Sequence, residues 1–188
     1  MKKTFHNLPD IIERLATCGS EQAYKELFDL LYLPVKKFAL CILHSNEEAE
    51  EISEDVMITL WKNRKTLTEI KNIHVYSFVI AKNLSLNLLK KKSKNPTCSL
   101  DEVDINFFFD DSSPEQIIID NELKKRLESA IQSLPPKCQF VFKLAKENNL
   151  SYKEISEILS ISVKTVDAHL VTATQKLAKI FKSEFQIK

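Results

Sequence analysis

The chain has 188 residues, of which 44% are hydrophobic and 28% charged, a composition typical of a globular protein and not of a disordered one. No apolar run reaches the length of a signal peptide or a membrane span, so we expect a cytoplasmic protein. With 1 glycine and 6 prolines, against many Leu, Ile, Lys, Glu and Ala residues, the chain favours helices joined by short polar breaks. The predicted fold class is all-α.

The net charge of +1 conceals blocks of opposite sign. Residues 62–95 hold 9 Lys or Arg against 1 acidic residue, whereas residues 96–128 hold 3 against 9. Residues 1–61 are acidic on balance, and residues 129–188 are basic. This alternation predicts separate charged patches on the surface.

Helix-start signals divide the chain into two helical domains. Ser20, Ser45, Ser113 and Ser151 are candidate caps, which predict helices beginning near residues 20, 46, 114 and 151. Residues 95–113 lack a helical period and carry dense acid, so we expect an acidic flexible linker between domains at 1–94 and 114–188. Leu134-Pro135-Pro136 predicts a helix boundary within the second domain.

Residues 46–64 predict a helix with one buried and one mixed face. Ala49, Ile52, Val56 and Leu60 form the buried stripe. The far side carries acids and apolar groups, with Met57 at its edge: Glu47, Glu51, Glu54, Asp55, Ile58 and Trp61. Such a surface favours docking of a basic protein partner with Trp61 as an anchor. The alternative is that Met57 and Trp61 pack beneath a neighbouring helix.

Residues 73–94 predict a second, mostly buried helix with one exposed strip. That strip holds Tyr76, Asn83, Asn87 and Lys90. Basic side chains near it are Lys62, Arg64, Lys65, Lys71, Lys82, Lys91, Lys92 and Lys94. Positive charge, amides and an aromatic ring together are typical of a surface that holds single-stranded nucleic acid. The alternative is a solvated lysine run that suits the helix C-terminus.

Residues 151–177 predict two short-linked helices. Ile155, Ile158 and Leu159 face one side of the first helix, residues 160–162 break the chain, and Ser162 caps the second helix. In that helix Val166, Leu170, Ala173 and Leu177 form the buried stripe. The face turned away from the stripe lacks carboxylates and carries Thr165, Ala168, His169, Thr172 and Lys176. This pattern favours a helix-turn-helix that enters the DNA major groove, although a plain helical hairpin has the same spacing.

Catalytic and metal-binding patterns are missing from the sequence. One glycine excludes a glycine-rich phosphate loop, and neither HExxH nor GxSxG occurs. Cys41 and His44 are only two potential ligands, too few for a structural zinc site. We therefore expect that the protein is not an enzyme and that it binds no metal, cofactor or small-molecule substrate.

The C-terminal segment resembles a known family. Its residues 134–181 read LPPKCQFVFKLAKENNLSYKEISEILSISVKTVDAHLVTATQKLAKIF, which is similar to region 4 of the extracytoplasmic-function (ECF) sigma factors of bacterial RNA polymerase. A LuxR-type output domain has a similar run around residues 161–169, so this segment alone leaves both open.

The N-terminal half resembles region 2 of the same family, and this resemblance distinguishes an ECF sigma factor from a LuxR-type regulator. EEAEEISEDVMITLW and YSFVIAKNLSLNLLKKK are similar to the two region 2 helices, in the expected order and spacing. The overall resemblance is to ECF sigma factors of Bacteroides-like bacteria. Tyr76 and Asn87 stand where many relatives have Trp and Asp, and His169 and Thr172 where many have Arg or Lys.

The resemblance implies roles for three surfaces. The acidic helix would dock on the beta-prime clamp helices of core RNA polymerase, and region 4 would meet the beta flap. The minus-35 element of promoter DNA would be read by Ser162, Lys164, Thr165, Ala168, His169, Thr172 and Lys176. The melted minus-10 element would be held by Lys62, Arg64, Lys65, Lys71, Tyr76, Lys82, Asn83, Asn87, Lys90 and Lys91. An anti-sigma factor is a further implied partner. We hypothesise that residues 99–111 fold back on the basic surface of residues 62–94 in the free protein; the alternative is that they form only a solvated tether.

Two other functions stay open at this point. A LuxR-like helix-turn-helix transcriptional activator would need a receiver or ligand domain that the N-terminal half does not resemble. An adaptor made of two helical bundles would bind proteins and not DNA.

Overall fold

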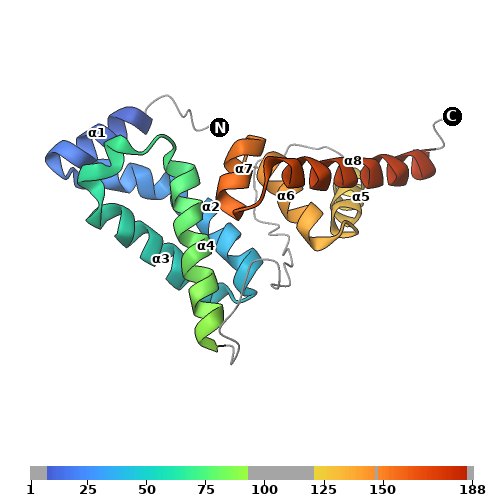
Figure 1. The fold of residues 1–188 in the computed structure, drawn as a ribbon, viewed down its shortest axis with the longest axis horizontal. Helices are drawn as coiled ribbons and strands as arrows, with labels where there is room; N and C mark the ends of the chain where they lie inside the picture. Colours follow the sequence, from blue (N-terminus) through green and yellow to red (C-terminus); the bar gives the residue numbers. More distant parts are fainter. Residues whose placement is uncertain (1–7, 93–120, 147, 186–188) are drawn as a thin grey trace. The chain divides into compact units, whose positions relative to one another are not determined.

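The computed structural model describes residues 8–92, 121–146 and 148–185, and within these ranges the regular structure is entirely helical (Figure 1). The chain divides into two compact units, Met1–Val103 and Asp104–Lys188. The prediction of an all-α fold with two helical domains is therefore confirmed. The residue limits of the predicted domains stay predictions. The acidic linker and the helix start near residue 114 lie outside the described residues.

The first unit is a helical bundle built around its longest helix. Its elements are α1 (Leu8–Cys18), α2 (Glu21–Leu43), α3 (Asn46–Lys62), the 3-10 helix η2 (Arg64–Glu69) and α4 (Ile73–Lys92). Helices α3 and α4 both pack on α2, while α1 packs on η2 and α2. Phe38 of α2 and Phe78 of α4 meet in the core with ring centroids 4.9 Å apart. The core therefore lies between the helices whose outer faces carry the predicted sites.

Side-chain caps start α2 and α3 where the sequence predicted. The Ser20 hydroxyl accepts a hydrogen bond from the backbone N–H of Ala23, and the Ser45 hydroxyl accepts one from that of Glu48, both at 3.3 Å. Each cap satisfies an N–H group that the first helical turn cannot pair internally. Helix α2 ends at His44, whose left-handed backbone (φ 58°) turns the chain into α3.

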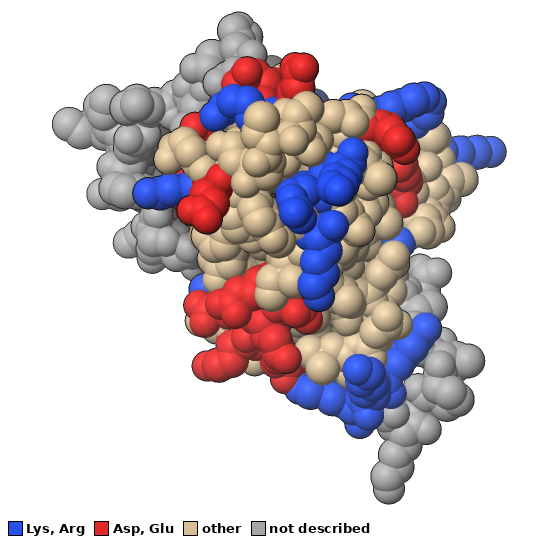
Figure 2. Space-filling model, turned by 90° about the vertical axis from the view of Figure 1, so that its left-hand side faces the viewer, with Lys and Arg blue, Asp and Glu red and all other residues tan. Residues whose placement is uncertain are grey.

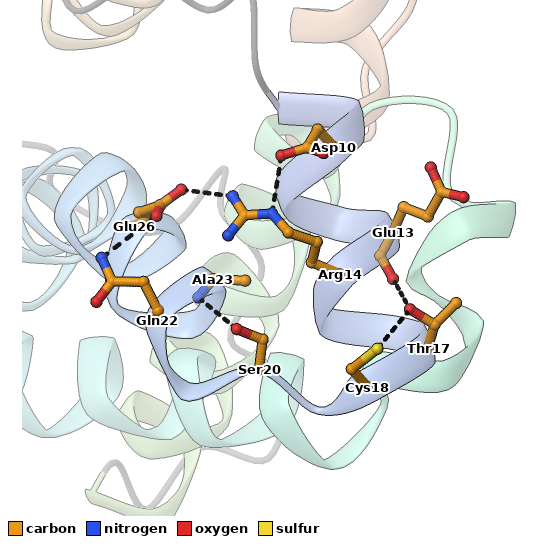
Figure 3. A network of polar contacts seen from close by, with 9 residues as sticks. All are labelled: Asp10, Glu13, Arg14, Thr17, Cys18, Ser20, Gln22, Ala23 and Glu26. Carbon is orange, nitrogen blue, oxygen red and sulfur yellow. Dashed lines mark hydrogen bonds and ion pairs between the residues drawn. The ribbon is translucent and has the colours of Figure 1, made fainter.

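A polar network joins α1 to α2 (Figure 3). Arg14 of α1 donates from Nε to Asp10 and from Nη2 to Glu26 of α2, both at 2.8 Å. Gln22 donates to the other oxygen of Glu26 at 3.3 Å. The hydrogen bond from Arg14 is the main reason why the pKa of Glu26 lies below its ordinary value. The network fixes α1 against the start of α2.

The second unit contains the remaining four described helices. These are α5 (Asn121–Gln132), α6 (Pro136–Lys146), α7 (Tyr152–Leu159) and α8 (Val163–Phe185). Helix α5 ends and α6 begins on either side of Leu134-Pro135, which confirms the predicted boundary; proline suits the first helical position because that N–H has no internal partner. One part of the core joins α5, α6 and α8 through Ala130, Leu134, Cys138, Ala173 and Leu177.

Neither a membrane-spanning helix nor a metal-binding cluster is found among the described residues. No described helix is both long and apolar enough to cross a membrane. No group of three or more His, Cys, Asp or Glu side chains in the described ranges is arranged to hold a metal ion.

Candidate functional site

Three serines mark the two ends of α7 and the start of α8. Ser151 begins α7 with a capping box: its hydroxyl accepts from the Glu154 N–H at 3.3 Å, and the Glu154 carboxylate accepts from the Ser151 N–H at 2.7 Å. Ser160 ends α7 in the left-handed conformation with φ 57°. The Ser162 hydroxyl then accepts from the Thr165 N–H at 3.0 Å. These bonds confirm the predicted break at residues 160–162 and fix where α8 begins.

Helix α8 buries the predicted stripe and leaves a free face for a ligand. Val166, Leu170, Ala173 and Leu177 are all buried, as the helical spacing predicted. The predicted minus-35 residues divide into two groups by exposure. Ser162, Lys164, Thr165, Ala168 and Lys176 are exposed, and His169 and Thr172 are half-buried. The free face thus carries cations and short polar side chains that suit base edges and phosphates.

His169 lies at the flank of this face, beside α6. Its Nδ1 is 3.5 Å from Sγ of Cys138, which is buried and whose pKa burial raises. The predicted reading face is therefore tilted toward α6 and does not lie directly opposite the buried stripe. The reason is geometric: at about 100° per residue, residues 164, 168, 175 and 179 stand most nearly opposite Leu170 and Ala173.

The sequence prediction missed two outward residues of α8. Val171 is 44% exposed, and Gln175 is also exposed. Both lie on the side of the helix that stands furthest from the core. A full rotation of the helical pattern would have identified them, whereas the prediction selected polar and basic residues by type.

Helix α3 presents the predicted acidic surface. Its buried stripe of Ala49, Ile52, Val56 and Leu60 is confirmed. On the outside Glu47, Glu51, Glu54, Asp55 and Ile58 are all exposed, with Ile58 at 46%. Figure 2 shows acidic side chains gathered on one part of this face, apart from groups of basic ones. The arrangement offers negative charge beside an exposed apolar group.

The acidic residues of α3 differ in whether they already have partners. Glu50 pairs with Lys36 at 2.5 Å, and Glu48 pairs with Lys92. Glu47 accepts from the Ser45 hydroxyl, and its own backbone N–H is the main reason why its pKa is lowered. Glu51, Glu54 and Asp55 make no ion pair with another described residue. These three carboxylates keep their charge available for a partner protein.

The structure decides between the two alternatives that the sequence left open for Met57 and Trp61. Met57 is 1% exposed, so it belongs to the core and not to the docking surface. Trp61 is half-buried, and its ring meets Tyr24 of α2 edge-on with centroids 5.0 Å apart. The alternative weighed from the sequence, packing against a neighbouring helix, is correct for both. Trp61 still has part of its surface free.

Helix α2 adds an aromatic strip that the sequence analysis missed. Tyr24, Phe28 and Tyr32 follow one another at four-residue spacing and are each half-buried. Phe28 stacks on Tyr32 with centroids 4.6 Å apart and meets Tyr24 at 6.4 Å. Spacing of i, i+4 and i+8 places side chains on one helical edge, and this signal was present in the sequence.

Most of the predicted minus-10 residues lie at the surface, as expected. Lys62, Lys65, Lys71, Asn83, Asn87, Lys90 and Lys91 are exposed, and Tyr76 is half-buried. The exposed lysines of this group make no ion pair with another described residue. Their charge is available to a polyanion.

Lys82 contradicts the prediction because it is buried. Its exposed fraction is 7%, and burial lowers the pKa of its ammonium group. Phe78, Lys82 and Ser85 follow at i, i+4 and i+7 on the buried side of α4, so helical position overrides the charge. Counting lysines near the strip, without placing each on the helix, led to the error.

Comparison with known proteins assigns both units. Residues 27–95 match the family model described as Sigma-70 region 2, and residues 124–177 match the one described as Sigma-70, region 4. The ECF RNA polymerase sigma factor SigW of Bacillus subtilis is 25% identical over 170 residues, covering 86% of this chain and 90% of that protein. The RNA polymerase sigma-H factor of Pseudomonas aeruginosa is 24% identical over 166 residues, covering 82% and 86%.

Solved structures agree on the fold. CnrH, solved in complex with the cytosolic domain of CnrY, matches with a TM-score of 0.57 at 15% identity, covering 93% of this chain and 97% of that one. The sigma factor RpoE of Bartonella quintana, solved with the anti-sigma factor NepR, matches with a TM-score of 0.59 at 14% identity, covering 86% and 98%. With regions 2 and 4 both present and in this order, the chain belongs to the sigma-70 family, in its ECF group.

Proposed function

We propose that this chain is a transcription initiation factor that binds core RNA polymerase and directs it to specific promoters. The observation that carries the proposal is the pairing, in one chain, of a region 2 unit with a region 4 helix-turn-helix. A LuxR-like activator is not favoured, because the match to region 2 over residues 27–95 leaves no room there for a receiver or ligand domain. An adaptor without DNA contact would not need the carboxylate-free face of α8.

The acidic surface of α3 is the proposed site for the polymerase. Glu47, Glu51, Glu54, Asp55, Ile58 and the free part of Trp61 would bind a basic, partly apolar helical surface, the beta-prime clamp helices in this family. Three unpaired carboxylates support this role, since they attract a basic partner and lose little by leaving water at the rim of an interface. Region 4 would contact the beta flap.

Promoter recognition is proposed to be divided between the units. In α8, Ser162, Lys164, Thr165, Ala168, Thr172 and Lys176 would face the minus-35 duplex, with His169 at the flank and Val171 and Gln175 as additions from the structure. In the first unit the exposed lysines together with Tyr76, Asn83 and Asn87 would hold the melted minus-10 strand. Stacking of a base on an aromatic ring contributes roughly 1–3 kcal/mol. Tyr76 is the aromatic residue of this set and is therefore the candidate for stacking on an unpaired base.

The remaining expectations are proposals as well. The chain would work in the cytoplasm, where its polymerase partner is found, and would act by binding alone, without catalysis or a cofactor. An anti-sigma factor is proposed as its regulator, in keeping with the neighbour RpoE, which was solved bound to the anti-sigma factor NepR. A nearer relationship to sigma factors of Bacteroides-like bacteria stays a prediction.

Run-off transcription with purified core polymerase tests the proposal. A sigma factor added to core should by itself produce a transcript with a fixed start from a candidate promoter. An activator would need another sigma factor in the reaction, and an adaptor would give no transcript under either condition. Failure of the chain to associate with bacterial core polymerase at low ionic strength would contradict the proposal.

A matched pair of variants tests the assignment of α8. Lys164→Ala removes a cation from the free face, and Lys182→Ala removes an equally exposed cation near the end of the same helix. Loss of one phosphate contact should lower the slope of log affinity against log salt for duplex DNA by about 0.9. We expect this change for Lys164→Ala and a much smaller one for Lys182→Ala; equal effects would contradict the assignment.

A further inference from the structure

Arg64 was predicted to contact DNA, but its guanidinium group is engaged within the protein. Its Cζ lies 4.5 Å from the centroid of the Trp61 ring, and its Nη1 donates to the backbone carbonyl of Trp61 at 2.9 Å. A Cβ placed on Gly19 would lie 3.6 Å from Nε, so the side chain also runs along the turn between α1 and α2. The residue is half-buried as a result.

These contacts place Arg64 where three parts of the first unit meet. Trp61 stands in the last turn of α3, Arg64 opens η2, and Gly19 turns α1 into α2 with φ +59°. Helix α1 packs extensively on η2, and Tyr24 of α2 covers another edge of the Trp61 ring. The guanidinium group therefore fixes the corner at which the chain leaves α3.

The cations on either side of this corner are free. Lys62 and Lys65 are exposed and make no ion pair with a described residue, and Lys71 is exposed just after η2. Their ammonium groups extend from a segment whose course depends on the corner. A backbone held in one conformation loses less entropy when several cations bind one strand together.

We infer that Arg64 is a positioning residue: it does not contact phosphate, but holds the corner between α3 and η2 so that Lys62, Lys65 and Lys71 present one surface to single-stranded DNA. The inference rests on the proposed function of the basic surface. Arg64 would also connect the two proposed surfaces, because the docking surface lies on α3 and the lysines follow from the end of α3 at which Trp61 stands.

The chemistry of the site requires arginine and not merely a cation. A planar guanidinium group lies flat on an indole ring while its edge donates to a carbonyl. A lysine ammonium group is a compact, strongly hydrated charge, and it cannot cover the ring and bond the carbonyl at the same time. Arg64→Lys therefore keeps the positive charge but loses the contacts that fix the corner between α3 and η2. This variant distinguishes a positioning role from direct phosphate binding.

The experiment uses the full chain and a fluorescein-labelled 20-nucleotide oligo-dT strand. Affinity is measured against salt concentration for the wild type, Arg64→Lys, Arg64→Ala and the control Lys65→Ala. We expect both Arg64 variants to weaken binding about fivefold at low salt, the ratio that corresponds to one net hydrogen bond. Lys65→Ala should lower the salt slope by about 0.7, the value for one phosphate contact on a single strand.

Trp61 provides a second readout because it is the only tryptophan of the chain. Its emission should shift in both Arg64 variants and stay unchanged in Lys65→Ala. Circular dichroism of each variant shows whether the helices are retained. If Arg64→Lys binds as the wild type does and Arg64→Ala behaves as Lys65→Ala does, Arg64 is a phosphate contact and the inference is wrong.

A triple variant separates failure of the inference from failure of the proposed function. Lys62→Ala/Lys65→Ala/Lys71→Ala should bind the strand far more weakly than the wild type. An unchanged affinity in this variant would overturn the basic surface itself, and the inference with it. A loss in the triple variant together with wild-type binding by both Arg64 variants would overturn the inference alone.

Discussion

A lysine turned toward the core of a helical bundle gives up hydration of its ammonium group, and Lys82 of α4 is such a residue. Burial lowers its pKa, so the folded state binds its proton less tightly than the unfolded state does. Between the folded pKa and the ordinary value of 10.5, the unfolded chain therefore carries more protons, and stability increases with pH in that window.

We predict that Lys82→Met raises the melting temperature at neutral pH and removes this pH dependence. The unbranched methionine fills a similar volume without a charge to desolvate. Thermal melts followed by circular dichroism across the alkaline window measure both effects. Lys90→Met, an exposed cation of the same helix, is the control and should not gain stability. A lower melting temperature for Lys82→Met would show that its charge is well compensated inside the fold.

Two helix ends share a left-handed backbone conformation, and substitutions at them should change the stability of the fold in opposite directions. Gly19 (φ 59°) and His44 (φ 58°) both adopt the left-handed region, which costs a side-chain-bearing residue about 1 kcal/mol. Gly19→Ala should therefore lower the free energy of unfolding by about 1 kcal/mol, since the new Cβ meets Arg64 only at an ordinary contact distance of 3.6 Å. His44→Gly should raise that free energy. Urea denaturation measures both, and a loss for His44→Gly would show that its side chain contributes more than the backbone strain costs.

At the scale of helices, one carboxylate of α2 links α1 to α2 through its hydrogen bond from Arg14. The pKa of Glu26 is lowered chiefly by the hydrogen bond from Arg14, then by the one from Gln22. A depressed carboxyl pKa stabilises the fold above the ordinary value of 4.5, and this contribution is lost as pH falls through the folded pKa. We predict that the melting temperature of the wild type falls more steeply below about pH 5 than that of Glu26→Gln. Parallel slopes in thermal melts would contradict this coupling.

The start of α8 has both a structural and a binding role, which substitutions at Ser162 can separate. Ser162→Ala removes the cap on the Thr165 N–H and should cost about 1 kcal/mol of stability. Ser162→Asp keeps a capping oxygen but adds a negative charge on the DNA-facing side. We expect normal stability and weakened duplex binding for Ser162→Asp, measured by urea denaturation and fluorescence anisotropy. Equal DNA affinity for the aspartate variant and the wild type would remove Ser162 from the contact surface.

Helical periodicity predicted those features that burial alone determines. The stripes Ala49–Leu60 in α3 and Val166–Leu177 in α8 are buried because apolar residues recur there at one helical period. The serine caps were equally predictable, since a short hydroxyl before a helical pattern has one local use. These local rules were sufficient for the fold class and for the position of the acidic face.

Features that depend on contact between helices could not be predicted in the same way. Arg64 lies where a second helix end and a turn decide its environment, which no single-helix pattern contains. His169 at the flank of α8 contacts Cys138, which is 31 positions away in the chain. The residue types were those of a nucleic-acid site, but the tertiary contacts decide which of them face outward.

At the scale of the whole molecule, acidic residues in the middle of α3 and lysines from the end of α3 onward suit two separate binding events. Glu51, Glu54 and Asp55 attract a basic protein, whereas Lys62, Lys65 and Lys71 attract a polyanion. Acidic residues on the proposed DNA-binding surface would repel phosphate, and lysines on the proposed docking surface would repel a basic protein. In the proposed function, keeping the two signs apart would allow one small unit to bind polymerase and a DNA strand together.

We therefore predict that Glu51→Gln/Glu54→Gln/Asp55→Asn weakens association with core polymerase roughly tenfold, because three exposed charges at about 0.5 kcal/mol each amount to about 1.5 kcal/mol, and about 1.4 kcal/mol corresponds to a factor of ten. The same variant should bind single-stranded oligo-dT at least as tightly as the wild type, since removing negative charge only reduces repulsion of phosphate. Glu13→Gln/Glu21→Gln/Asp29→Asn removes the same charge from exposed positions on α1 and α2 and serves as the control. Surface plasmon resonance with immobilised core at two salt concentrations separates the outcomes. A comparable loss of core binding in both triple variants would mean that net charge, and not the surface of α3, governs the association.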